Sequence, residues 1–243
     1  MNNKNELLHN FEEMQIGLDE SFTFHCTQCG KCCIHRDDIL LTAKDVFRIA
    51  RKFQVSPKEL IEQYCETYIG RDSHLHVVRL KPSGRVQRCP LLKDRKCSVH
   101  DVKPYVCAMF PIGRGLSIQK GKTEHLSKTE IKYIFVNPGC GDDTEQHTVR
   151  EWFNRFQIPL EDEFFVSWSK AMISLSKCLK SIEKNTTEKA MSAIYNALFA
   201  GLYLNYDMAD DFDSQVQINF ESSVQFLQSL SEFNKSVMTP EST

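Results

Sequence analysis

Apolar residues repeat with helical spacing between residues 42 and 65. Apolar residues that recur three and four positions apart predict an amphipathic helix. Thr42 with Asp45 three positions later forms a capping box, which predicts a helix start, and Ser56-Pro57 with Glu59 predicts a second one. The apolar faces of these two helices are Val46, Ile49, Ala50 and Phe53, followed by Leu60, Ile61 and Tyr64.

The same helical period dominates the chain from about Thr148 onward. Thr148 and Glu151 form another capping box, with Trp152, Phe153 and Phe156 after it at helical spacing. Three further apolar stripes follow, which predict a helical core that packs on the preceding part of the chain rather than a cofactor site. The stripes are Phe164, Phe165, Trp168, Met172, Leu175, Leu179 and Ile182; Ala190, Met191, Ile194, Tyr195, Leu198, Phe199, Leu202 and Tyr203; and Phe220, Val224, Phe226, Leu227 and Leu230.

The segment between these helical regions has the pattern of short strands and turns. Residues 74–80 alternate and are rich in β-branched side chains, and residues 86–89 follow a Pro-Ser-Gly turn. This pattern predicts a small β-hairpin that delivers Cys89 at its end. Residues 98–110 predict short helical turns interrupted by proline, and residues 137–141 predict a tight loop.

These elements predict a mainly helical α+β fold with a cysteine-rich metal-binding core around a small hairpin, and a helical C-terminal half. We expect residues 1–25 to be a lead-in that packs through Leu7, Leu8 and Phe11. Residues 26–145 would form the cysteine-cluster domain, and residues 146–243 a helical domain packed on it.

Composition restricts the class of protein. The 243 residues are 41% hydrophobic and 26% charged, with 10 Gly and 8 Pro, which excludes a disordered or collagen-like chain. No window reaches the roughly 20 apolar residues of a membrane helix, and the first residues lack an apolar signal core. We therefore expect a cytoplasmic protein without a membrane partner, and the net charge of −2 does not favour nucleic acid as a partner.

Cysteine is the unusual feature of the composition. The chain has 10 cysteines, and in the reducing compartment expected here clustered cysteines usually bind metal. Cys65 and Cys178 stand alone in the sequence, and we expect them to be small buried hydrophobic residues. The other eight are the candidate ligands of a metal or cluster: Cys26, Cys29, Cys32, Cys33, Cys89, Cys97, Cys107 and Cys140.

The spacing of the first four cysteines is typical of thiolate ligands. A C-x2-C turn directs two sulfurs to one side, and Gly30 can adopt the positive φ angle that turns backbone N–H groups toward sulfur. The run C-x2-C-x2-C also opens the ferredoxin motif, and Cys89-Pro90 is like its Cys-Pro end. Neighbouring side chains diverge, so the adjacent pair Cys32-Cys33 suits two nearby sites or a polynuclear cluster. The spacing leaves two kinds of bound group open, an iron–sulfur cluster or zinc. Of the clusters, we expect the four-iron, four-sulfur type. Eight thiolates would fill two four-ligand sites, but two are not required.

Basic residues accompany the cysteines in the middle of the chain. Residues 79–132 hold 13 Lys and Arg against 4 Asp and Glu, a net charge of +9, which leaves −11 for the remainder. These cations could lower thiol pKa values and neutralise a cluster, dock an acidic protein partner, or form an ordinary solvated surface.

Other polar residues give no sharper prediction. His25, His35 and His100 lie near cysteines in the sequence, but we assign none of them as a ligand. The acidic residues at positions 207, 210, 211 and 213 lack the spacing of a calcium loop and predict a solvated turn at a helix end. No catalytic acid, base or nucleophile can be named, so whether the protein is an enzyme stays open.

Taken in order, these motifs resemble the bacterial cysteine-cluster family named for C-x-x-C-x-x-C-C, also called YkgJ-like or zinc- or iron-chelating proteins. The resemblance covers residues 26 to about 141. It departs at His100 and Lys103, where an aromatic residue and an arginine are expected. The residues that carry it are Cys26-Thr-Gln-Cys29-Gly-Lys-Cys32-Cys33, Ile39-Leu-Leu-Thr42 with Asp45, Arg88-Cys89-Pro-Leu-Leu, Cys97-Ser-Val, Lys103-Pro104, Cys107, Phe110-Pro111 and Asn137-Pro-Gly-Cys140.

The resemblance implies iron–sulfur or zinc binding through these cysteines, in a family mostly without an assigned reaction. We therefore expect a metal-binding protein for electron transfer, sensing or chelation. Flagellin lysine N-methylases are similar over the same motif, which makes protein lysine methylation one alternative. Against it, Gly113-Arg-Gly115 lacks the third glycine of a nucleotide loop. A zinc-stabilised interaction module is the other alternative.

Overall fold

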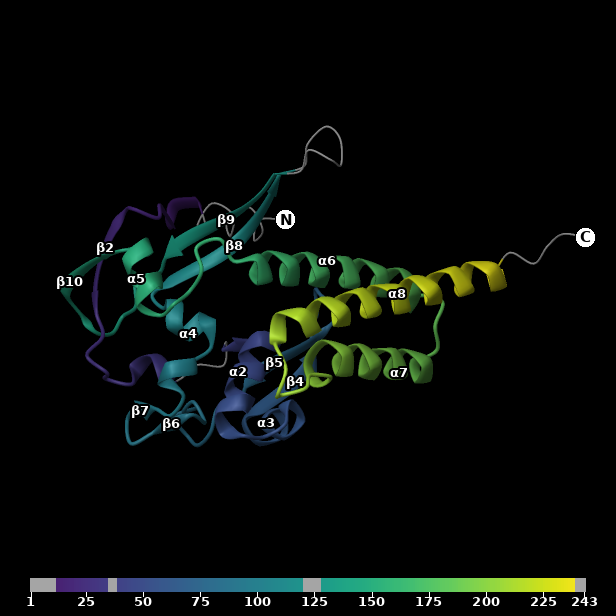
Figure 1. The fold of residues 1–243 in the computed structure, drawn as a ribbon, viewed down its shortest axis with the longest axis horizontal. Helices are drawn as coiled ribbons and strands as arrows, with labels where there is room; N and C mark the ends of the chain where they lie inside the picture. The colour runs from purple at the N-terminus through teal and green to yellow at the C-terminus, as the bar shows by residue number, and fades with distance from the viewer. Residues whose placement is uncertain (1–11, 35–38, 120–127, 239–243) are drawn as a thin grey trace, which may run out of the picture. The chain divides into compact units, whose positions relative to one another are not determined.

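The computed structural model describes residues 12–34, 39–119 and 128–238 (Figure 1). The fold is α+β, with small antiparallel sheets and a helical C-terminal half, as the sequence predicts. Residue contacts group the chain into two units that interleave along the sequence. Unit 1 comprises Met1–Arg36 and Pro82–Val166, and unit 2 comprises Asp37–Lys81 and Ser167–Thr243. Each unit combines two separated segments, whereas the predicted domains are consecutive segments. The predicted domain boundaries stay a prediction.

Unit 1 contains three small antiparallel sheets. Strand β9 lies between β1 and β8, β10 pairs with β2, and β6 pairs with β7. The strands are β1 (Gln15–Ile16), β2 (Ser21–His25), β6 (Leu92–Lys93), β7 (Lys96–Cys97), β8 (Ile112–Gln119), β9 (Lys128–Phe135) and β10 (Asp142–Thr148). The helices are the 3-10 turns η1 (Lys31–Cys33) and η2 (His100–Val102), α4 (Tyr105–Met109) and α5 (Val149–Arg155).

The core of unit 1 is aromatic. Phe22 and Phe24 alternate with polar residues on β2 and point inward, where both rings meet Trp152 of α5 edge to face. The Trp152 indole N–H donates to the Met109 carbonyl at 3.0 Å, so the buried ring keeps a hydrogen-bond partner. Strand β2 belongs to the predicted lead-in, but its alternation makes it part of the core. Leu7, Leu8 and Phe11 lie outside the described residues.

Unit 2 combines a three-stranded antiparallel sheet with helices. The sheet has the order β3–β5–β4. Its strands are β3 (Leu40–Leu41), β4 (Cys65–Ile69) and β5 (His76–Leu80). Its helices are α2 (Ala43–Phe53), α3 (Pro57–Tyr64), α7 (Glu188–Phe199), the π-helix η4 (Ala200–Leu204) and α8 (Phe212–Met238), together with most of α6 (Glu163–Glu183), whose first residues belong to unit 1.

The capping boxes predicted from the sequence are confirmed. The Thr42 hydroxyl accepts from the Asp45 N–H, the Ser56 hydroxyl accepts from the Glu59 N–H, and Thr148 starts α5 in the same way. The apolar stripes of the C-terminal half are also helical. Of the acidic residues after η4, Asp207, Asp210 and Asp211 lie before α8 and Asp213 lies in its first turn. An Asp211 carboxylate oxygen accepts the Ser214 N–H. None of the described helices is both long enough and apolar enough to cross a membrane.

The predicted hairpin between residues 74–80 and 86–89 is wrong. Strand β5 pairs instead with β4 over five residues and with β3 over two. Residues 86–89 form no strand, and Arg88 makes only isolated bridges with Ser83 and Ile34. Pro82 removes a backbone donor just after β5, and β4 carries the β-branched and aromatic residues that complete the sheet.

His76 in unit 2 gives an expected pH dependence of stability. Its ring lies 4.7 Å from the Phe199 ring, and among the described residues its buried Nδ1 has no partner. Burial lowers the pKa of His76 below its ordinary value of 6.5. The unfolded chain therefore binds the proton more tightly, so this contribution to stability is present above pH 6.5 and is lost as pH falls below it. His76→Phe keeps a ring but cannot titrate. Denaturant unfolding at about pH 7.5 and 5.5 should show a smaller acid loss in the variant. Identical losses in both proteins would contradict this role.

Candidate metal centre

All eight cysteines of the candidate site belong to unit 1, and we call them the cysteine site. Cys65 and Cys178 belong to unit 2, where Cys65 is buried at the start of β4 and Cys178 is half-buried on α6. The eight come from several elements. Cys26 follows β2, Cys29 lies in the loop before η1, Cys32 and Cys33 lie on η1, Cys89 precedes β6, Cys97 lies on β7, Cys107 lies on α4, and Cys140 lies between β9 and β10.

The first loop of the cysteine site has the geometry expected from its glycine. Gly30 has φ = 73°, a left-handed conformation that glycine adopts without strain. Hydrogen bonding from the Lys31 backbone N–H lowers the pKa of Cys29, against an opposing effect of burial. The prediction that Gly30 turns backbone amides toward sulfur is therefore confirmed, and Cys29 is stabilised as a thiolate.

The adjacent residues Cys32 and Cys33 direct their sulfurs to the same region. Their Sγ atoms are 3.9 Å apart on the 3-10 turn η1. Sulfurs around one tetrahedral metal with 2.3 Å bonds are separated by about 3.8 Å. The expected divergence of neighbouring side chains therefore does not occur here, because the tight 3-10 turn brings both sulfurs to one side.

A second loop is held against the first by backbone hydrogen bonds. The Cys89 N–H donates to the Cys33 carbonyl at 2.8 Å, and Ile34 forms a β-bridge with Arg88. The Leu92 N–H in turn donates to the Cys89 carbonyl, which leads the chain into the β6–β7 hairpin that carries Cys97. These contacts explain how Cys89 and Cys97 reach a motif far away in the sequence.

The pairing of β2 with β10 brings Cys26 and Cys140 together. His25 lies opposite Asp142 in this ladder, so the cysteine next to each strand end lies at the same end of the sheet. Gly141 has φ = 72°, and a Cβ atom there would lie 2.4 Å from the His25 carbonyl oxygen. Only glycine allows this close approach of the two backbones.

A polar network beside this end of the sheet was not predicted from the sequence. The His25 Nδ1 lies 3.2 Å from an Asp142 carboxylate oxygen, and its Nε2 lies 3.6 Å from Glu145. Glu145 also lies 3.2 Å from the His147 Nε2 and 3.7 Å from the Arg155 guanidinium. These residues are distant in the sequence and carry no motif, so only the β2–β10 pairing could reveal the network.

The thiols influence one another electrostatically. Burial raises the pKa of Cys89 and of Cys97, and burial with the neighbouring thiols raises the pKa of Cys140 to about 11. The pKa of Cys33 is raised by its hydrogen bond with Cys32 and by burial. The charge of Cys32 acts on five other thiols, those of Cys29, Cys33, Cys89, Cys97 and Cys140. The thiolates of the cysteine site therefore repel one another, and a bound cation would relieve this repulsion.

The donor set fits a thiolate-binding metal, although the side chains are not arranged around one point. Within residues 12–34, 39–119 and 128–238, no group of three or more Cys, His, Asp or Glu side chains is arranged to hold a metal ion. In the thiol form the sulfurs are neutral, so nothing draws them together. Metal binding removes the thiol protons and supplies that attraction. Thiolates suit zinc and iron–sulfur clusters.

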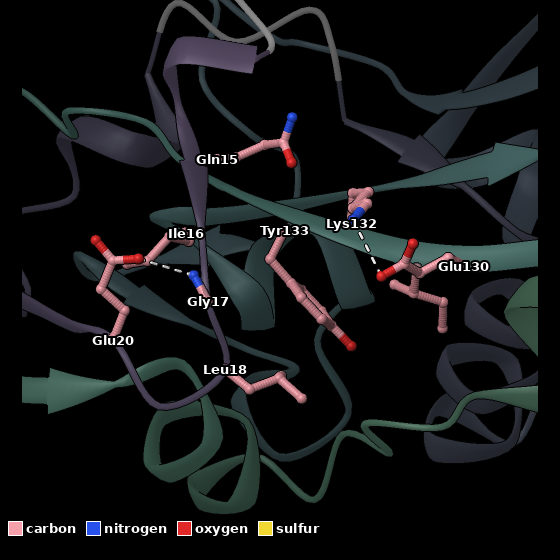
Figure 2. A pocket seen from close by; sticks show the side chains of 9 residues that line it. Gln15, Ile16, Gly17, Leu18, Glu20, Glu130, Lys132 and Tyr133 are labelled. Carbon is pink, nitrogen blue, oxygen red and sulfur yellow. Dashed lines mark hydrogen bonds and ion pairs between the residues drawn. The ribbon is translucent and has the colours of Figure 1, made fainter.

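A surface pocket of about 350 Å³ in unit 1 lies apart from this chemistry. It is lined by β1, the turn that follows it and β9, and contains no cysteine (Figure 2). Its charged residues are already paired: Lys132 lies 3.0 Å from Glu130, and the Gly17 N–H donates to Glu20. The pocket therefore offers no free charged group to a ligand.

Comparison with known protein families confirms the resemblance expected from the motifs. Residues 25–134 match the family model CxxCxxCC, described as "Putative zinc- or iron-chelating domain". The matched segment includes seven of the eight cysteines, and Cys140 lies beyond its end.

One relative among curated proteins extends the comparison. An uncharacterized protein of the archaeon Methanocaldococcus jannaschii is 29% identical over 101 residues, which are 41% of this chain and 49% of that protein. The chain thus spans about half the length of this relative. No solved structure matches the chain.

Proposed function

Because residues 25–134 match the CxxCxxCC family model, we propose that the cysteine site binds an iron–sulfur cluster and serves electron transfer, sensing or chelation. The family description names zinc or iron as the chelated metal, without a specific role. The choice of a cluster, of these eight ligands and of this role is our proposal.

The observation that carries the proposal is that all eight cysteines of the cysteine site belong to unit 1. Backbone pairing joins loops that are distant in the sequence, as in the 2.8 Å bond from Cys89 to Cys33 and the pairing of His25 with Asp142. The two remaining cysteines belong to unit 2. A purely structural use of cysteine as a small hydrophobic residue would not collect eight thiols that are mostly half-buried.

Two features favour a cluster over a single zinc ion. Eight thiols exceed the four ligands of a structural zinc site. Backbone N–H groups of Lys31 and Gly141 hydrogen-bond to the Cys29 sulfur, and such bonds tune the reduction potential of iron–sulfur clusters.

In this proposal the chain supplies ligands and hydrogen bonds, while a bound cluster supplies the capacity to accept and release one electron. Loop residues 26–33 and 89–97 provide thiolates, and the amides around Cys29 stabilise negative charge on sulfur. For methyl transfer we find no supporting feature: Gly113 and Gly115 lie within strand β8 rather than in a loop that could hold a nucleotide.

The test is an absorption spectrum of anaerobically purified protein, combined with iron, zinc and acid-labile sulfide analysis. We expect a broad band near roughly 400 nm, with iron and sulfide in equal amounts. A colourless protein with stoichiometric zinc would overturn the cluster and favour a zinc-stabilised interaction module. Transfer of methyl groups from S-adenosylmethionine to a lysine-rich protein would instead support the enzyme alternative.

A further inference from the structure

We propose that an acidic protein docks on six exposed cations around the cysteine site, which we call the basic rim. The inference rests on the proposed function, since a protein partner would exchange electrons or metal with the site. The rim consists of Lys31, Arg85, Arg88, Lys93, Arg95 and Lys96.

The six rim side chains are exposed and carry uncompensated charge. Over the part of the chain that the structure describes, none of them makes an ion pair or a side-chain hydrogen bond. Four other cations of unit 1 each face a carboxylate. These pairs are Arg114–Asp162 at 2.8 Å, Arg150–Asp19 at 2.7 Å, Lys132–Glu130 at 3.0 Å and Arg155–Glu145 at 3.7 Å. The unpaired cations are thus concentrated in the loops that carry the cysteines.

The rim follows the backbone that holds the thiols. Lys31 precedes Cys32, Arg88 precedes Cys89, and Lys96 precedes Cys97. Asp94 and Arg95 have φ angles of 47° and 62°, which is the geometry of a tight two-residue hairpin turn between β6 and β7. Because these loops are tied together by the contacts between Cys33 and Cys89, a partner bound to the rim would lie next to the cysteine site.

A cation outside the rim acts on one thiol of the site. Lys103 lowers the pKa of Cys97, and its ammonium lies 4.4 Å from the Phe156 ring centroid. The rim side chains are exposed and make no ion pair among the described residues, so their charge is available to a partner in solution.

The chemistry of the rim fits a protein rather than a nucleic acid. Val86 is 43% exposed between Arg85 and Arg88, which adds an apolar contact of the kind that protein interfaces use. Residues 82–103 contain no Phe, Tyr or Trp on which a base could stack. The net charge of −11 outside residues 79–132 would repel a long phosphate backbone, whereas a carboxylate patch of limited size can meet the rim alone.

The test measures binding of fluorescent poly-L-glutamate, as a model of an acidic protein surface, to the full chain at low ionic strength. The hairpin variant Lys93→Glu/Arg95→Glu/Lys96→Glu reverses three rim charges. A matched control, Lys177→Glu/Lys184→Glu/Lys189→Glu, makes the same change in net charge on exposed lysines of unit 2. A second rim variant, Arg85→Glu/Arg88→Glu, tests the other loop in case the hairpin variant fails to fold.

We expect both rim variants to bind poly-L-glutamate at least ~10-fold more weakly than the wild type. The control should bind as the wild type does, and added salt should weaken the binding of every protein. Three outcomes would overturn the inference. The control could lose binding as much as the rim variants, the wild type could fail to bind poly-L-glutamate, or it could bind a single-stranded oligonucleotide of equal charge more tightly. Metal analysis of the same proteins separates the two proposals. A wild type without metal contradicts the proposed function but leaves the rim testable, whereas metal loss confined to the rim variants overturns the docking role.

Discussion

Cys32→Ser is expected to lose most of its bound metal and much of its stability. The charge of Cys32 acts on five other thiols of the cysteine site, so we expect its sulfur to be a ligand. A neutral hydroxyl is a poor substitute for a thiolate ligand. We therefore expect metal affinity to fall at least ~100-fold, which is more than the loss of a residue that only hydrogen-bonds to a ligand would cause. Because structural zinc contributes about 10–16 kcal/mol in small domains, the unfolding temperature should fall with it. Metal content per chain and thermal unfolding measure both effects.

Cys178→Ser is the matched control for this experiment. Cys178 is half-buried on α6 in unit 2 and belongs to none of the loops of the cysteine site. It should keep its full metal content, whereas Cys29→Ser and Cys107→Ser should behave like Cys32→Ser. Equal metal loss in all four variants would show that the ligand assignment is wrong.

Asp162→Asn is expected to destabilise the protein by about 3–5 kcal/mol, because it leaves a buried guanidinium without a counter-charge. The Arg114 Nη2 donates to Asp162 at 2.8 Å, and both side chains are only 4% exposed. Among the described residues, the Nε and Nη1 atoms of Arg114 are buried without a hydrogen-bond partner, although the Phe165 ring lies 4.1 Å from the guanidinium. Among the described residues, Asp162 therefore provides the opposite charge for a cation that is almost fully buried.

The choice of asparagine isolates this charge effect. Asp162 also accepts the Phe165 N–H at the start of α6, and asparagine caps a helix as well as aspartate does. Asp19→Asn, which removes the exposed partner of Arg150, should destabilise the protein far less, because water screens an exposed ion pair. Urea unfolding compares the three proteins. Similar small losses in both variants would contradict an uncompensated buried charge at Arg114.

Predictions from the sequence succeeded where the governing contacts are local. The helices that start after Thr42, Ser56 and Thr148 were predicted because a capping box involves residues only three positions apart. The positive φ angle of Gly30 follows from local backbone sterics in the same way. The pairing of β5 was predicted wrongly because strand partners are chosen by packing between segments, and two alternating runs do not reveal which segment lies beside which.

The sequence by itself determined where helices begin, which cysteines form a thiol-rich donor set and which family motif they follow, since each depends on residue type and short spacing. Only the tertiary structure decided that β2 pairs with β10, that Cys89 bonds to Cys33, and that Arg114 is buried against Asp162. These contacts join residues far apart in the chain. The cost of closing the intervening loops is repaid only when the whole unit packs, so no local pattern encodes them.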